Sequence, residues 1–263
     1  MSPPRPLPWL DPGAPFPPAE SAWGQQDPIP GLLAAGGTLD TPTLRQAYRQ
    51  GIFPWYSEGQ PILWWSPDPR MVLRPARFRP SHSLRKALRA ALRQGRLQIR
   101  MDSAFDAVIV ACAHTPRPGQ HGTWILPEIK AAYRGLHREG IAHSVEAWWD
   151  GRLVGGLYLV NMGRAVFGES MFSHRPNASK MALAALVAAC RAWGVTLIDC
   201  QQNTRHLASL GAAEEARDRF LHDVRQAIAE PTPDWRWDCL YWNQLWPDAA
   251  LDTLSSPIPA APL

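Results

Sequence analysis

Apolar residues recur every three to four positions in several segments, a spacing typical of amphipathic helices. In segment 81–96, Leu84, Leu88 and Leu92 fall on one face, Ser81 or Ser83 can cap the start, and Gly95 can end it. The same pattern predicts helices that begin at Thr41-Pro42, at a cap formed by Asp102, and at Pro127. Further helices are expected over 177–194, 206–211 and 214–229.

Strand patterns take over after the third of these helices. Segment 143–172 contains Asp150-Gly151, a strong two-residue hairpin signal, and a second turn near 161–164, so it predicts a three-stranded antiparallel meander. Segment 195–201 is a short apolar strand that we expect at the centre of the sheet. Strands followed by helix, strand and helix predict an α+β domain, a mixed sheet with helices on both faces.

The two ends of the chain lack periodicity. Residues 1–30 contain ten prolines and predict an extended or partly disordered lead-in, and the Pro/Ala-rich stretch 247–263 predicts a loose tail. No apolar run reaches the roughly 18–20 residues that span a bilayer, and the N-terminus lacks the apolar core of a signal peptide. These features predict a protein of the cytoplasm without a membrane partner.

Composition narrows the chemistry. The 263 residues are 46% hydrophobic and 19% charged, which is typical of a folded globular chain. The four cysteines form no C-x-x-C pair, which argues against a zinc ribbon or a redox dithiol, and we expect Cys112 and Cys190 to be core thiols. No P-loop, G-x-G-x-x-G or Ser/His/Asp order is present.

Positive charge is concentrated in one stretch. Residues 70–100 hold nine Arg, one Lys and no acid, a charge of +10, which leaves −6 for the rest of a chain with net charge +4. The cations that project from the helix predicted over 81–96 are Arg85, Lys86, Arg89, Arg93 and Arg96. They could form an ordinary solvated face, but like charges without acidic partners favour binding to a polyanion: RNA, DNA or an acidic membrane surface.

Polar residues in apolar surroundings mark a candidate site. Asp199 and Gln201 flank Cys200 at the carboxyl end of the buried strand, where ligands gather in open α/β sheets, and Glu169 lies near another strand end. Alternation puts Asp199 and Gln201 on one side, where they can orient a nucleophile or polarise a carbonyl. The alternative is structural: Asp199 pairs or caps, and Gln201 bonds the backbone.

Four tryptophans lie in polar, loop-like contexts. They are Trp55, Trp64, Trp65 and Trp124. Their rings could stack on nucleic-acid bases or could be buried in the core.

Several motifs occur in a characteristic order. They are GLLAAGGTL (31–39), GIFPWYSEGQPILWWSPDPR (51–70), GTWI (122–125), HSVE (143–146), FGESMFS (167–173), NASK (177–180), LIDCQ (197–201) and HLASLGA (206–212). Across residues 31–240 the chain strongly resembles the leucyl/phenylalanyl-tRNA–protein transferases of the bacterial N-degron pathway.

The resemblance implies a small N-terminal domain, 1–68, then a GNAT-type acyltransferase domain, 69–246, with a mixed, mostly antiparallel sheet flanked by helices. It also implies transfer of Leu, Phe or Met from aminoacyl-tRNA to proteins that begin with Arg or Lys, which marks them for degradation. The chemistry is aminolysis of an ester, so no metal or redox cofactor is implied. We expect a monomer.

Residue roles follow from the resemblance alone. Asp199 and Gln201 match the catalytic pair, Glu169 matches the active-site Glu, and Trp55 and Trp124 match the aromatics near the terminal adenosine of the tRNA. The basic helix becomes the face for the acceptor stem, with contacts mainly to phosphate. The residues that match the lining of the aminoacyl pocket are Leu157, Met171, Leu183, Leu186, Cys190 and Ile198.

This sequence departs from the best-known members of the family within that pocket. They carry Phe at the positions of Leu186 and Cys190 and Met at that of Leu157, so the order of preference among Leu, Phe and Met stays open.

Two other functions compete with this interpretation. An acyl-CoA N-acyltransferase would need a [QR]-x-x-G-x-[GA] loop, which the sequence lacks. A non-catalytic RNA-binding protein would account for the basic stretch and for the tryptophans.

Overall fold

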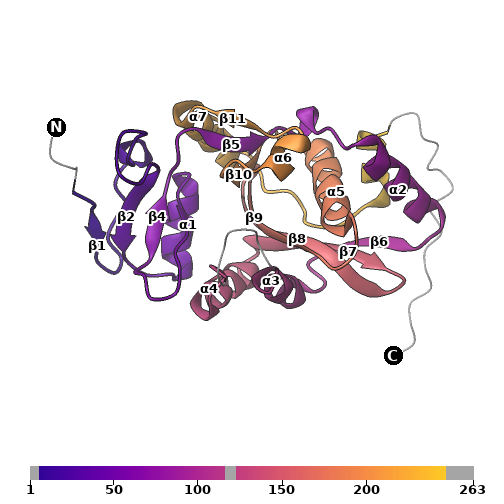
Figure 1. Ribbon diagram of the computed structural model, residues 1–263, viewed down its shortest axis with the longest axis horizontal. Coiled ribbons are helices and arrows are strands. Elements are labelled where there is room, and N and C mark those ends of the chain that lie inside the picture. Colours follow the sequence, from indigo (N-terminus) through magenta and orange to yellow (C-terminus); the bar gives the residue numbers. More distant parts are fainter. Residues whose placement is uncertain (1–5, 116–122, 247–263) are drawn as a thin grey trace.

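The computed structural model describes residues 6–115 and 123–246, in which two sheets lie side by side (Figure 1). The smaller sheet has the strand order β1-β2-β4-β3, and the larger has the order β11-β5-β10-β9-β8-β7-β6. The larger is antiparallel except for the pairing of β10 with β9. The expected α+β fold with a mixed, mostly antiparallel sheet is confirmed.

The strands have the following bounds. The smaller sheet consists of β1 (Trp9–Leu10), β2 (Leu32–Gly36), β3 (Phe53–Pro54) and β4 (Leu63–Trp65). The larger consists of β5 (Arg70–Leu73), β6 (Leu97–Met101), β7 (Ala142–Trp149), β8 (Arg152–Met162), β9 (Ala165–Ser173), β10 (Ile198–Gln201) and β11 (Ala213–Glu215).

The helices cover both faces of the larger sheet (Figure 1). On one face lie α2 (His82–Arg93) and α5 (Ala178–Ala192), and on the other lie α3 (Phe105–Ala113) and α4 (Pro127–Arg138). The remaining helices are α1 (Thr41–Arg49), α6 (Arg205–Ser209) and α7 (Arg217–Ile228), with short 3-10 turns η1 (Ala19–Ser21), η2 (Pro75–Arg77) and η3 (Cys239–Gln244). No helix in the described ranges is both long and apolar enough to cross a bilayer.

The predicted meander and helices are confirmed, as is the internal place of β10 between β5 and β9. Gly155 shows how tightly α5 packs on β8, because a Cβ built there would lie 2.5 Å from the Cβ of Ala178. The expected cap of α3 is wrong. Asp102 bonds His143 and Ser144 instead, and Glu146 from β7 accepts the Ala104 N–H at 2.7 Å.

The described part of the Pro-rich lead-in packs against the smaller sheet and contains β1 and η1, which corrects the expectation of an extended or partly disordered segment. Leu10, Phe16 and Ala19 are buried, β1 pairs in parallel with β2, and the Phe16 ring lies 4.7 Å from that of Trp64. Apolar residues between the prolines supply burial that compensates for ordering the chain, and an edge strand tolerates proline. The tail expected to be loose, 247–263, lies outside the described residues.

Three further strands of the larger sheet, each of five residues or fewer, were not predicted. β5 and β6 lie inside the basic stretch, and β11 has three residues. Strands this short carry little periodicity, so tertiary pairing decides them.

Candidate active site

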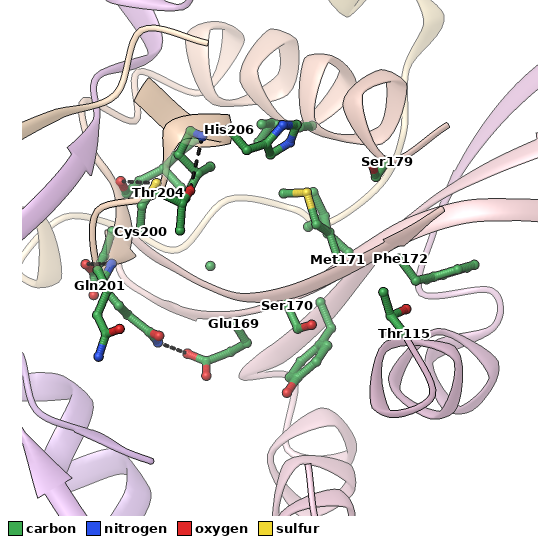
Figure 2. A pocket seen from close by; sticks show the side chains of 18 of the residues that line it. Thr115, Glu169, Ser170, Met171, Phe172, Ser179, Cys200, Gln201, Thr204 and His206 are labelled. Atoms are coloured by element: carbon green, nitrogen blue, oxygen red, sulfur yellow. Dashed lines mark hydrogen bonds between the residues drawn. The ribbon is translucent and has the colours of Figure 1, made fainter. Parts of the chain in front are cut away.

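A cavity of about 680 Å³ opens where β9 and β10 meet the smaller sheet. Its wall includes Glu169, Gln201 and Met171, which Figure 2 shows around one space, with His206 on the side opposite Glu169. Trp55 also lines the cavity, so both sheets contribute to it.

Two irregularities in neighbouring strands build the polar end of this cavity. In the pairing of β8 with β9 the register passes from Ser170 to Gly168, which leaves Glu169 without a partner. In the pairing of β10 with β5 it passes from Asp199 to Gln201, which leaves Cys200 without one. Bulges re-aim side chains and are common beside active sites.

Glu169 is held by two tyrosine hydroxyls. Tyr48 of α1 donates to Oε1 at 2.7 Å, and Tyr133 of α4 donates to Oε2 at 2.9 Å. Burial raises the pKa of Glu169 to about 7, with a further rise from the negative charge of Asp199, while the hydrogen bonds from the tyrosines act in the opposite direction. This carboxyl therefore exchanges its proton near neutral pH.

Gln201 adopts a left-handed backbone conformation, with φ of 61°. Its backbone N–H donates to Asp199 Oδ1 at 2.8 Å, and its side-chain Nε2 donates to Glu169 Oε1 at 3.1 Å (Figure 2). The amide oxygen of Gln201 is left to accept a hydrogen bond from a ligand.

Asp199 is fully buried and forms a two-point ion pair with Arg70 of β5, at 2.8 and 2.6 Å. The guanidinium of Arg70 lies between the rings of Phe53 and Phe220, 4.7 and 4.5 Å from their centroids. The structural alternative for Asp199 is therefore the observed one. Its carboxylate accepts the Gln201 backbone N–H, so Asp199 also holds Gln201 in place.

The apolar end of the cavity contains most of the residues expected to form the aminoacyl pocket. Those that line it are Leu157, Met171, Leu183, Leu186 and Ile198. Cys190 does not line it. This residue is fully buried in the core one turn beyond Leu186 along α5, burial raises the pKa of its thiol, and the expectation that it is a core thiol is confirmed.

The four tryptophans divide between the two proposed uses. Trp64 and Trp65 are buried, and Trp64 donates to the Gly36 carbonyl oxygen at 2.9 Å. Trp55 and Trp124 are half-buried and line the cavity, so their ring faces are accessible from it.

The basic helix α2 keeps most of its cations exposed. Arg85, Lys86 and Arg93 face solvent, whereas Arg89 stacks on the Trp246 ring at 5.3 Å. Arg96 is not a free cation, because it pairs with Asp150 from the hairpin between β7 and β8. That acid is distant in sequence, so the pairing could not be expected from the stretch itself.

Sequence reasoning missed four residues of this site: Arg70, Tyr48, Tyr133 and His206. The two tyrosines lie on the buried faces of α1 and α4, and a buried tyrosine hydroxyl needs a partner, which was the available signal. His206 lines the cavity, and burial and the positive charge of Lys180 lower the pKa of its imidazole.

The residues that converge here form a largely apolar cavity with a carboxyl group and an amide at one end and an imidazole on the opposite side. Such a site suits the transfer of an apolar acyl group, because it buries the group and orients a nucleophile at its polar end. Within the described ranges, no three His, Cys, Asp or Glu side chains are placed to hold a metal ion.

Comparison with known proteins identifies the family, and that family consists of enzymes that transfer acyl groups. The family model "Leucyl/phenylalanyl-tRNA protein transferase" matches residues 72–225, and the model of its N-terminal domain matches 37–68. The chain belongs to the leucyl/phenylalanyl-tRNA protein transferase family, which is a family of aminoacyltransferases.

The similarity covers nearly whole proteins. A leucyl/phenylalanyl-tRNA–protein transferase of Polaromonas sp. is 60% identical over 92% of this chain and 95% of its own length. That of Albidiferax ferrireducens is 58% identical over 96% of this chain and 99% of its own length.

Solved structures give a much weaker likeness. A GCN5-related N-acetyltransferase from Kribbella flavida aligns with a TM-score of 0.33 at 12% identity, over 64% of this chain and 58% of that chain. A score this low carries no argument about function.

Proposed function

We propose that this chain transfers leucine, phenylalanine or methionine from aminoacyl-tRNA to the N-terminal α-amine of proteins that begin with Arg or Lys, and so marks them for degradation. The observation that carries the proposal is the position of Glu169 and Gln201 at the polar end of an apolar cavity. The family name supplies the donor, an aminoacyl-tRNA, and the acceptor, a protein.

The apolar wall is proposed to take the aminoacyl side chain. Leu186 and Leu157 line this wall. Leu186 is smaller than the Phe of the best-known family members, so it changes the size of the pocket directly. Cys190 does not line the pocket and can change its size only through packing. Trp55 and Trp124 are proposed to stack on the terminal adenosine, since both line the cavity and both are half-exposed.

In the proposed reaction the α-amine attacks the ester carbonyl carbon. A C–N bond forms, the ester C–O bond breaks, and the ribose oxygen leaves with a proton that the amine gives up. An α-amine has a pKa of about 7.7–8.0, so a useful fraction is neutral at pH 7 and positioning supplies much of the catalysis.

Each polar residue has a role in this scheme. The Gln201 amide oxygen accepts a hydrogen bond from the attacking amine, and Asp199 is a positioning residue that holds the Gln201 backbone. Glu169 faces the cationic acceptor. Its ionised form attracts Arg or Lys, and a pKa of about 7 also lets it accept the proton of the amine and pass it on to the leaving ribose oxygen.

The remaining partners follow from the same scheme. The exposed cations of α2 are proposed to contact phosphates of the acceptor stem. The chain is further proposed to act as a monomer in the cytoplasm, where charged tRNA is made.

The first test is transfer of labelled Leu and, separately, Phe from charged tRNA to a peptide that begins with Arg, with a peptide that begins with Ala as control. We expect transfer to the Arg peptide only. Gln201→Ala should lower kcat with little change in the KM for aminoacyl-tRNA, since Gln201 acts on the amine. Wild-type turnover in this variant would contradict the assigned role.

Thermal stability and tRNA binding, measured beside the transfer assay, separate the two competing functions. An acyl-CoA N-acyltransferase would be stabilised against heat by CoA and not by aminoacyl-tRNA. A non-catalytic RNA-binding protein would bind tRNA but transfer nothing to either peptide, and its function would survive Gln201→Ala.

A further inference from the structure

A second cavity, of about 670 Å³, lies at the opposite end of α5 from the candidate active site. The first cavity receives Ser179, near the start of α5, and Gln201, at the end of β10. The second receives Arg191, near the end of α5, and Thr196, just before β10. The two cavities are therefore separate sites.

Four arginines from three segments line the second cavity. Arg74 precedes η2 and Arg77 ends it, Arg191 comes from α5, and Arg219 comes from α7. Arg74 and Arg77 are neighbours in the basic stretch, whereas Arg191 and Arg219 are more than 100 positions away in sequence. The convergence of the three segments is a product of the fold.

The acidic groups at this cavity do not balance the arginines. Arg74 donates to Glu215 at 2.9 Å and to Asp223 at 2.5 Å, and Arg219 lies 3.8 Å from Glu215. In the described ranges no ion pair joins Arg77 or Arg191 to an acid. Four positive charges against two negative ones leave an excess of two.

Arg191 is fixed in place by the backbone. Its Nε donates to the Pro75 carbonyl oxygen at 2.9 Å and its Nη1 to that of Gln244 at 2.7 Å. Burial lowers the pKa of this guanidinium, so its charge is incompletely compensated where it lies. A bound anion would compensate it, and because two carbonyl contacts already orient the side chain, binding would cost little further entropy.

We propose that the cavity lined by Arg74, Arg77, Arg191 and Arg219 binds a phosphate group. Planar guanidinium groups match phosphate oxygens through paired hydrogen bonds, and the Thr196 hydroxyl at the same wall is a further donor. An excess of two charges suits a dianionic phosphate or two neighbouring phosphodiesters.

Two sources carry this chemistry: the phosphate backbone of the tRNA, or a free phosphate compound. The backbone source extends the proposed function, because η2 leads through residues 78–80 directly into the basic helix α2. The phosphate site itself does not depend on that function.

The test uses full-length protein and pyrophosphate as the probe in isothermal titration calorimetry at low salt. The variant is Arg77→Gln/Arg219→Gln, since both side chains are exposed and their removal should leave the fold intact. The control is Arg138→Gln/Arg225→Gln, which removes the same charge from exposed positions, with Arg225 directed toward Glu20 at 3.4 Å. Urea unfolding checks that all three proteins are equally stable.

We expect the Kd for pyrophosphate to rise at least about tenfold in the variant and to stay within about twofold in the control, given the usual strength of hydrogen bonds between charged groups. If the tRNA backbone is the source, the variant also weakens tRNA binding and lowers its salt slope, and pyrophosphate competes with tRNA. If a free phosphate compound is the source, pyrophosphate binding falls while tRNA binding is unchanged.

Absence of pyrophosphate binding by the wild-type protein, or equal binding by variant and wild type, would overturn the proposal. Aminoacyl transfer is measured in parallel at saturating tRNA, where the variant should keep the wild-type kcat. A protein that binds pyrophosphate through these arginines but transfers no amino acid would refute the proposed function and leave the phosphate site standing.

Discussion

Glu169 combines two properties at one residue: a carboxyl group in an apolar cavity and a fixed orientation set by Tyr48 and Tyr133. Burial favours its protonated form, while each tyrosine hydroxyl and the Gln201 amide favour the ionised form. The balance places its pKa at about 7, close to the pKa of a free α-amine. Acceptor and carboxyl group are thus matched for proton exchange at neutral pH.

The raised pKa of Glu169 predicts a pH-dependent stability. The folded state binds this proton more tightly than the unfolded state, so the advantage is full below about pH 4.5 and is lost as pH rises through about 7. The Glu169→Gln variant has no carboxyl proton at this position, so it does not lose this contribution as pH rises. The free energy of unfolding of Glu169→Gln relative to wild type should therefore increase by roughly 2–3 kcal/mol between pH 5 and pH 8.

Urea unfolding at the two pH values measures this difference, with Glu58→Gln, a change at an exposed carboxylate, as control. A difference between Glu169→Gln and wild type that is the same at both pH values would show that the carboxyl group titrates normally.

The ion pair between Arg70 and Asp199 gives a second prediction. Arg70→Met leaves a buried carboxylate without its partner and should destabilise the fold by about 3–5 kcal/mol. Adding Asp199→Asn removes that charge, so the double variant should be less destabilised than the sum of the single variants. Additive effects in this double-mutant cycle would mean that the two side chains do not stabilise each other.

At the scale of elements, the site depends on how α5 sits against β8. Gly155 lets the first turn of α5 approach the strand, and that turn carries Ser179 into the active-site cavity. The bulges at Glu169, which lies in the middle of β9 and not near a strand end as expected, and at Cys200, near the end of β10, then aim both strands at the same space. A displaced helix would therefore disturb the cavity as well as the core.

Gly155→Ala tests this packing. The new Cβ would lie 2.5 Å from the Cβ of Ala178 and 2.7 Å from its carbonyl carbon, so backbone has to move, and we expect a decrease of about 1–3 kcal/mol in unfolding free energy. Gly24→Ala is the matched control, since its nearest neighbour is 3.8 Å away. Equal stability of the two variants would show that α5 adjusts freely.

Across the whole molecule, the larger sheet separates two kinds of binding region. The cavity for the acyl group lies where the two sheets meet, and the exposed cations of α2 lie toward the other end of the larger sheet (Figure 1). A long polyanionic ligand with an apolar group at one end could use both regions. This division matches the shape of an aminoacyl-tRNA.

Arg85→Gln/Arg93→Gln tests the polyanion face. Removing one cation that neutralises a phosphate should flatten the dependence of log K on log salt by about 0.7–0.9, so tRNA binding should weaken and the slope should fall by about 1–2. Filter binding over a salt series measures both, and Arg138→Gln/Arg225→Gln removes equal charge elsewhere. If the slope of log K against log salt equals that of the control, the cations of α2 are ordinary solvated side chains that do not contact tRNA phosphates.

The sequence by itself determined the elements with strong periodicity: the helices over 82–93, 127–138 and 178–192 and the meander of β7, β8 and β9. Their apolar faces and turn residues are local, so pattern alone locates them. The motifs of the family also identified Glu169 and Gln201, although their roles remain proposals.

Only the tertiary structure decided which distant groups meet. Arg70 and Asp199 are separated by 129 positions, and Tyr48 and Tyr133 reach Glu169 from different helices. The order of the lead-in and the four-arginine cavity are likewise unpredictable from local pattern. Burial and long-range pairing depend on which surfaces come together, and that information is spread over the whole chain.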